Sequence, residues 1–286
     1  MTLVLLNYQH KAERIICLSD TRVSVGNKPL SDLVTKIMPL TARVHRAGGS
    51  YGVESAEIKS IDYGFAFSGS VLGAMSVYSW STAILSNLVP HSSLPADWET
   101  NVSIDSVVAV LRKVSADVFF KSCEMNSGSN SPDNATILER HGFKILLFGY
   151  DRDTDGFVVY EVSTDFDEQN TPIATYKKCV LSSESDRRTF FIGSKRFGEV
   201  YSEAKDSGDV PNLEAMLQEI FSDTSTPNVG GHVMAGVAMK SRFVVLPVEK
   251  NNISPGCFSI MGEDNENAIL DGLIISMHAL PIPWDI

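Results

Sequence analysis

The sequence predicts an α+β fold of four layers, αββα, in which two stacked and mainly antiparallel sheets are flanked by pairs of helices. Short apolar segments bounded by Gly, Pro and Asn are typical of strands. Longer segments carry apolar residues at helical intervals, which is typical of amphipathic helices. Strand runs and helix pairs are segregated along the chain, which disfavours an alternating βαβ fold. Two sheets with helices on each outer side would bury every apolar face.

The first part of the chain is rich in expected strands, separated by polar tips and turns. A polar tip over 7–13 makes the first two strands a hairpin, and Gly26-Asn27-Lys28-Pro29 is typical of a turn. Residues 41–60 are expected to form an insertion, because Gly48-Gly49 and mixed charges interrupt the apolar pattern. The expected strands of this part are 2–6, 14–19, 21–25, 35–40 and 63–68.

Two helices are expected after Gly69-Ser70, which ends the last of these strands. They span 71–88 and 104–122, the second with Ser103 as its N-cap, and a loop over 90–101 joins them. A flexible loop follows over 126–134.

The second half of the chain repeats the order of strands, two helices and strands. Strands are expected at 143–150, 156–162, 175–181 and 189–192, helices at 195–205 and 211–221, and strands at 233–239, 243–247 and 273–277. We expect one domain over 1–286, with the insertion near 41–60 and a C-terminal extension over 249–286.

The composition excludes several classes of function. A formal net charge of −11 argues against a nucleic-acid-binding surface, where a basic stripe is expected. No apolar run approaches the length of a membrane span, and the N-terminal run is too short for a secretory signal, so cytoplasm is the default compartment. The four cysteines are far apart and form no CxxC pair, and the six histidines show no ligand spacing; we expect no metal and no cofactor. The chain also has no GxxxxGK[ST] loop for ATP.

The second residue is Thr2, directly behind Met1. Removal of Met1 would leave a threonine with a hydroxyl and a free α-amine. The hydroxyl is a weak nucleophile until a base takes its proton, and the α-amine, with an unperturbed pKa of about 7.7–8.0, can be that base. The bland alternative is that a small second residue simply suits Met removal.

Six short blocks, in order, then resemble one family. They are Ser19-Asp20-Thr21-Arg22, Thr35-Lys36-Ile37, Phe67-Ser68-Gly69, Phe148-Gly149-Tyr150-Asp151 with Gly156 and Tyr160, Ile192-Gly193-Ser194, and Val229-Gly230-Gly231. Together with the N-terminal threonine, these blocks resemble the proteasome β-subunit-like N-terminal nucleophile (Ntn) hydrolases. The nearest relatives are the bacterial proteasome-like proteins, the HslV and Anbu groups. The spacing from Asp20 to Lys36 matches the family, whereas Thr2 precedes Asp20 by slightly more than usual.

The resemblance implies a role for each candidate residue. Thr2 would be the nucleophile, Lys36 the neighbouring cation that stabilises developing negative charge, and Asp20 the carboxylate that orients Lys36. The Gly69 N–H would point into the oxyanion hole, and Ser194 would help to relay the proton of the Thr2 amine. The alternatives are an ordinary Asp20–Lys36 ion pair, a plain helix-entry glycine at Gly69, and an N-cap at Ser194.

One family position is altered. An Asp is expected three residues before the residue that precedes the glycine pair, but that slot holds Thr226, and Asp223 lies three residues earlier.

The resemblance predicts a threonine peptidase that acts on peptides or unfolded protein. The alternatives are a non-catalytic proteasome-like subunit with a structural role, and an amidase for a small amide. The resemblance also implies a homo-oligomer and, by analogy alone, an ATP-dependent unfoldase partner.

Overall fold

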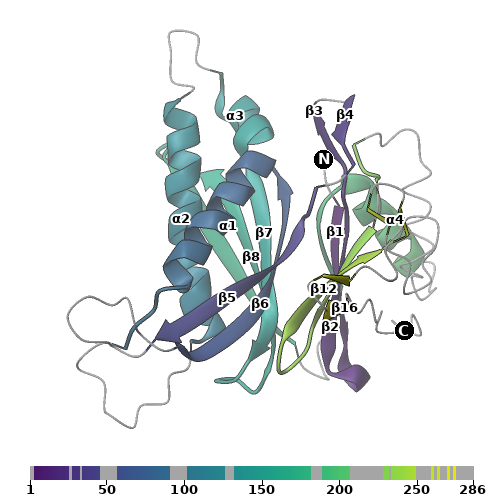
Figure 1. Ribbon diagram of the computed structural model, residues 1–286. Helices are drawn as coiled ribbons and strands as arrows, with labels where there is room; N and C mark the ends of the chain where they lie inside the picture. The colour runs from purple at the N-terminus through teal and green to yellow at the C-terminus, as the bar shows by residue number, and fades with distance from the viewer. Residues whose placement is uncertain are drawn as a thin grey trace.

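The structure is a computed structural model. It describes residues 3–25, 28–32, 34–45, 57–90, 102–125, 132–181, 189–206, 228–231 and 233–248, together with four short strand segments near the C-terminus. Two five-stranded antiparallel sheets form its centre (Figure 1).

The first sheet contains the N-terminal strand as an interior strand, between β10 and β2. Its order is β10-β1-β2-β11-β12, with β1 Leu3–Gln9, β2 Arg14–Asp20, β10 Thr189–Gly193, β11 Val233–Ala238 and β12 Phe243–Val248. The 3₁₀ turn η1, His10–Ala12, connects β1 to β2. Alternate residues of β1 enter different apolar clusters, Leu3 and Leu5 one and Val4 and Leu6 the other. This strand is therefore buried on both faces, which explains its continuous apolar run.

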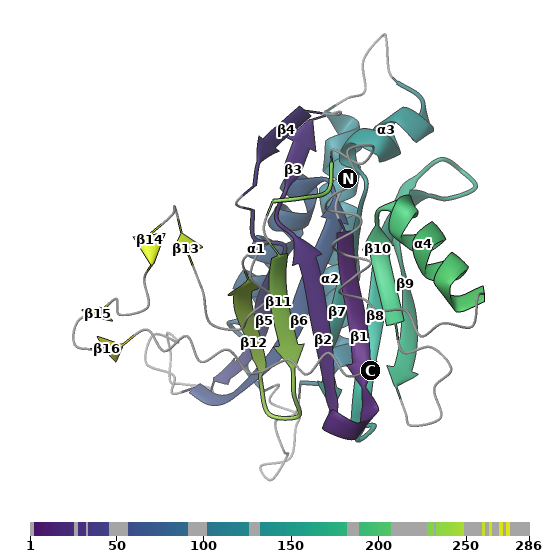
Figure 2. The same ribbon diagram turned by 90° about the vertical axis from the view of Figure 1, so that its right-hand side faces the viewer.

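The second sheet lies against the first. Its order is β5-β6-β7-β8-β9, with β5 Ile37–His45, β6 Glu57–Gly69, β7 Phe143–Asp151, β8 Gly156–Phe166 and β9 Pro172–Leu181. Side chains of both sheets, among them Cys17, Phe148 and Phe243, form one core between them. Figure 2 shows the first sheet from its outer side, with α4, Lys195–Asp206, beside β10.

Helices cover the outer face of each sheet. α1 Val71–Leu85 and α2 Ile104–Glu124 pack on the second sheet, and α3 Asn134–His141 follows them. Each of these helices has an N-cap side chain that accepts a hydrogen bond from a backbone N–H of the first turn. The N-cap residues are Ser70, Ser103 and Asp133. On the other side, Phe197 of α4 packs against the first sheet.

In the described part of the chain, α1 and α2 pack on the second sheet and α4 packs on the first, and the two sheets share a core (Figure 1). The mixed α and β composition and the two antiparallel sheets are confirmed. The expected pair of helices on the first sheet is described only for α4, because 211–221 lies outside the described residues.

Small strand pairs complete the described chain. A hairpin of β3 Val23–Val25 and β4 Lys28–Ser31 projects from the end of β2 (Figure 1). Near the C-terminus, β13 pairs with β14 and β15 with β16. Their bounds are Ser259–Ile260, Glu263–Asp264, Ile269–Leu270 and Leu273–Ile274.

Three expectations for local structure were wrong. Residues 41–45 and 57–60 are paired strand rather than insertion, because Leu40, Ala42 and Val44 alternate into the core along β5. No element was predicted directly after the expected loop over 126–134, but helix α3, Asn134–His141, lies there. Of the turn expected over 26–29, Lys28 and Pro29 belong to β4, which pairs with β3, and Gly26 and Asn27 lie outside the described residues.

Candidate active site

Asp20 is the last residue of β2 and is fully buried. Its Oδ1 accepts hydrogen bonds from the Leu3 backbone N–H and from Lys36 Nζ, both at 2.9 Å. Its Oδ2 accepts one from the Gly230 backbone N–H at 3.2 Å. A buried carboxylate is tolerated only when its oxygens are satisfied in this way. The Asp20 carboxylate therefore connects three segments by hydrogen bonds: β1, the residue before β5, and the Gly230-Gly231 pair.

Lys36 directly precedes β5, and its side chain is also fully buried. Besides Asp20, its Nζ donates to the Arg22 backbone carbonyl at 2.5 Å. Burial lowers the pKa of Lys36, an effect that the Asp20 carboxylate opposes. Burial likewise raises the pKa of Asp20, against the opposing effect of Lys36 and of the Leu3 and Gly230 N–H groups. The two charges compensate each other in a dry environment.

The N-terminal strand reaches this pair through its first described residue. The Leu3 nitrogen that donates to Asp20 is the atom that the peptide bond joins to Thr2. Thr2 itself lies outside the described residues, as do Asp223 and Thr226. The structure thus brings Asp20 and Lys36 together beside the attachment point of Thr2.

Ser194 lies at the neighbouring end of β10. It is buried and sits between β10 and the first residue of α4. The register of β1 against β10 pairs Leu3 with Gly193, whose φ is 105°. Ser194 is therefore one residue beyond the pair that contains Leu3, at the same end of the sheet as Asp20.

Gly69 ends β6 on the second sheet. The Phe67 N–H donates to the Lys36 carbonyl at 3.3 Å, and Gly69 follows two residues later, about 7 Å further along the strand. Its φ is 93°, in the region that favours glycine. An added Cβ would lie 2.5 Å from the Gly142 carbonyl oxygen. Gly69 is exposed, so its backbone is accessible from solvent.

Gly69→Ala is expected to lower the free energy of unfolding by about 1–3 kcal/mol, because the backbone conformation is strained for any L side chain and the new methyl would overlap Gly142. Denaturant unfolding measures this loss. Gly156→Ala is the matched control, since its added Cβ would meet no heavy atom closer than 3.7 Å. Equal effects of the two substitutions would contradict the account of Gly69.

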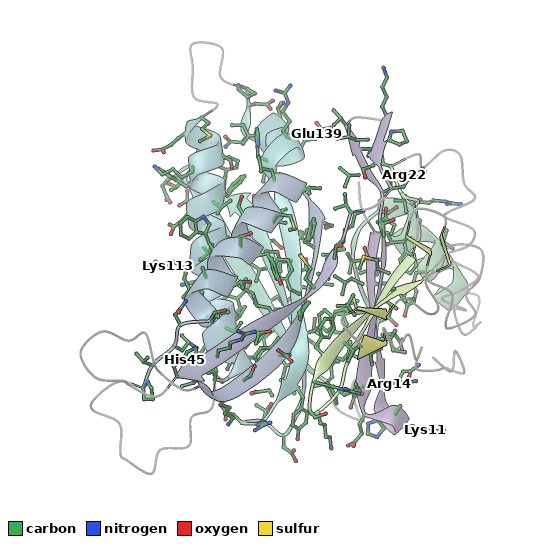
Figure 3. The ribbon with its side chains drawn as sticks, viewed as in Figure 1. Lys11, Arg14, Arg22, His45, Lys113 and Glu139 are labelled. Carbon is green, nitrogen blue, oxygen red and sulfur yellow. The ribbon has the colours of Figure 1, made fainter. Side chains whose placement is uncertain are left out.

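Sequence reasoning missed two contributors to the site. The carboxylate of Asp32 binds the Arg22 guanidinium with both oxygens, at 2.7 and 2.9 Å. Gly230 donates its N–H to Asp20 and accepts the Arg22 N–H through its carbonyl. No motif around Asp32 indicates this contact, since it arises only when the chain after β4 folds back on Arg22. Figure 3 shows Arg22 at the end of the first sheet from which the β3–β4 hairpin projects.

In the described part of the chain, no three His, Cys, Asp or Glu residues are grouped as metal ligands would be. None of the helices described there is both long and apolar enough to span a lipid bilayer.

Comparison with known proteins identifies the fold. No protein-family model and no curated protein matches the sequence. Among solved structures, Anbu from Hyphomicrobium sp. strain MC1 superposes with a TM-score of 0.50 at 10% sequence identity, over 88% of this chain and 89% of that one. The chain has the Anbu fold. A Gly-1 mutant of Anbu from the same organism gives 0.49 at 12% identity, with 88% and 89% covered. The similarity to Anbu that the motifs predicted is confirmed at the level of the fold.

Proposed function

We propose that this chain is an N-terminal threonine peptidase of the proteasome-like type, with Thr2 as nucleophile after removal of Met1. One observation carries the proposal: a single carboxylate oxygen, Oδ1 of Asp20, accepts both the N–H that follows Thr2 and the Lys36 ammonium. Thr2 is bonded to the Leu3 nitrogen, so the point at which it is attached lies 2.9 Å from that carboxylate oxygen. The required hydroxyl, amine and ammonium would then lie in one place.

The chemistry follows from these groups. The Thr2 hydroxyl oxygen attacks the peptide carbonyl carbon while the Thr2 α-amine takes its proton, directly or through water. The amine then protonates the departing nitrogen, the C–N bond breaks, and an ester of Thr2 remains. Water hydrolyses this ester, with the amine again as base, and restores the hydroxyl.

Three further groups would support these steps. Lys36 supplies positive charge next to the nucleophile, and the Gly69 N–H stabilises the oxyanion. Ser194 helps to relay the proton of the Thr2 amine. Ser194 directly follows Gly193, the β10 partner of Leu3, which supports that role.

We also propose that the chain acts as a homo-oligomer. Leu72 and Trp80 of α1 are 81% and 64% exposed and border a groove of about 480 Å³ between α1 and α2. Exposed apolar surface of this kind marks an interaction site, and a second copy is the partner that the proteasome-like fold favours.

Leu72→Ser with Trp80→Ser is therefore expected to shift the chain to a smaller species in light scattering at micromolar concentration, because the apolar contact surface is lost. Val180→Ser, at a half-exposed position on β9, should leave the mass unchanged. A monomeric wild type would overturn the oligomer proposal.

The decisive test of the activity combines an intact-mass measurement with rates on a panel of fluorogenic peptides, for the wild type and Thr2→Ala. The proposal requires a chain that begins at Thr2 and peptide hydrolysis that depends on the Thr2 hydroxyl. Retained Met1 together with equal rates for both chains would favour the non-catalytic subunit. Cleavage of small amides alone would identify an amidase.

A further inference from the structure

The Arg22–Asp32 pair lies immediately behind the Lys36 ammonium. Asp32 binds Arg22 through two parallel hydrogen bonds, from Nε to Oδ1 and from Nη2 to Oδ2. Such a fork fixes both the position and the plane of the guanidinium. An added Cβ on Gly230 would lie 2.8 Å from Arg22 Cζ and Nη1, so the guanidinium is packed against the glycine backbone as well.

The backbone on both sides of this pair is also fixed. The Thr21 hydroxyl donates to the Asp32 carbonyl at 2.5 Å, and the Val34 N–H donates to the Thr21 carbonyl at 3.1 Å. The Arg22 N–H donates to the Gly230 carbonyl at 3.1 Å. The peptide unit between Thr21 and Arg22, which directly precedes the Arg22 carbonyl, is therefore held from several directions, and Asp32 takes part through its side chain and its backbone.

We infer that Asp32 is a positioning residue of the proposed active site: its carboxylate holds Arg22 so that the Arg22 carbonyl and Asp20 together aim the Lys36 ammonium. This inference rests on the proposed function. Asp32 does not touch Lys36; it acts through Arg22 and through its own negative charge.

The charges around Lys36 determine the direction of the expected effect. Asp20 and Asp32 favour the ammonium form of Lys36, whereas burial and the positive charge of Arg22 oppose it. Removing the Asp32 carboxylate loosens one acceptor of the ammonium and takes away a negative charge that favours the ammonium form. Both changes lower the pKa of Lys36 further. Activity that needs the ammonium should then be lost at a lower pH on the alkaline side.

If the Arg22–Asp32 pair contributed only to stability, Asp32→Asn would lower the thermal midpoint and leave the kcat of the folded chain unchanged. The inference predicts the opposite. The Arg22 and Asp32 side chains are 22% and 40% exposed, so solvent screens their charges, and Asn keeps one oxygen acceptor for the guanidinium. Asp32→Asn should therefore change the thermal midpoint little while it changes catalysis strongly. The matched control is Glu161→Gln, which breaks the Lys144–Glu161 pair of the second sheet, at 3.0 Å and similarly exposed.

The test measures kcat, KM and the pH profile for Asp32→Asn, Asp32→Glu and Glu161→Gln in the full chain. Asp32→Asn is expected to lower kcat by about 10- to 100-fold with little change in KM, since small displacements of catalytic groups cost that much. Its alkaline limb should move to lower pH. Asp32→Glu should restore part of the rate, because it keeps a carboxylate for Arg22. Wild-type kcat and pH profile in Asp32→Asn would overturn the inference.

A second readout separates this inference from the proposed function. NMR titration of the Lys36 side chain in the full chain reports its pKa whether or not peptides are cleaved. If the wild type cleaves no better than Thr2→Ala, the proposed function fails, but a lower Lys36 pKa in Asp32→Asn and not in Glu161→Gln still supports the Asp32–Arg22–Lys36 connection. An unchanged Lys36 pKa in Asp32→Asn overturns it.

Discussion

Thr2→Ala is expected to lower kcat/KM for peptide hydrolysis by about 10⁴-fold or more, the size of loss seen when a hydrolase loses its nucleophile. The α-amine, Lys36 and Asp20 would all remain, but no hydroxyl would be present to form the ester. Thr2→Ser should retain part of the rate, because it keeps the hydroxyl. Steady-state rates on the best peptide of the panel, corrected for the fraction of chain without Met1, measure both effects.

The stability of Thr2→Ala should be close to that of the wild type. The described contact of this strand with Asp20 uses the Leu3 backbone N–H, which Thr2→Ala keeps. Thr41→Ala is a matched control, because it removes a threonine hydroxyl bound to Asp62, about 17 Å along the chain from Lys36. Equal activity of Thr2→Ala and Thr41→Ala would exclude the threonine mechanism.

Lys36→Met is expected to lower the free energy of unfolding by about 3–5 kcal/mol, the usual cost of leaving one partner of a buried ion pair alone. Both side chains are fully buried, so water cannot take over the solvation of the remaining Asp20 carboxylate. Peptide hydrolysis should be lost in the same variant. Chemical denaturation and activity assays on one preparation measure the two effects.

The double variant Asp20→Asn with Lys36→Met tests the cause of that loss. It removes both charges, so a large part of the stability should return. Recovery should be incomplete, since Asn offers one carbonyl oxygen for the Leu3 and Gly230 N–H groups that now share two carboxylate oxygens. A double variant no more stable than Lys36→Met would show that the ion pair does not determine the stability of this region.

Sequence patterns predicted the parts of the fold in which burial leaves a clear period. The runs in β1 and β2 are buried on both faces, and the apolar stripe of α2 is long enough to repeat several times. Shorter or partly polar elements gave no such pattern. α3 buries a single residue, Ile137, and depends on its Asp133 cap. In β5, Leu40, Ala42 and Val44 alternate with polar residues, but the run is short and the Gly48-Gly49 pair that follows it favoured an insertion.

The residues of the candidate site likewise include some that a sequence motif predicted and others that no motif indicated. Asp20 and Lys36 were found because each lies in a short motif of the family, and their contact is present in the structure. Asp32 has no motif, because its role depends on a bidentate contact made across a turn of the chain. The Gly230 N–H was missed for another reason: a backbone donor has no residue-type signature. Roles for Thr2, Gly69 and Ser194 stay predictions.

The complete burial of Leu3 in a central strand has a practical consequence for recombinant work. An affinity tag or fusion partner joined to the N-terminus would be attached close to the Leu3 nitrogen that donates to Asp20. Its peptide bond would also convert the amine that the proposed mechanism needs into an amide. Expression vectors for these assays should therefore place the tag elsewhere, or use a specific protease that leaves Thr2 as the first residue.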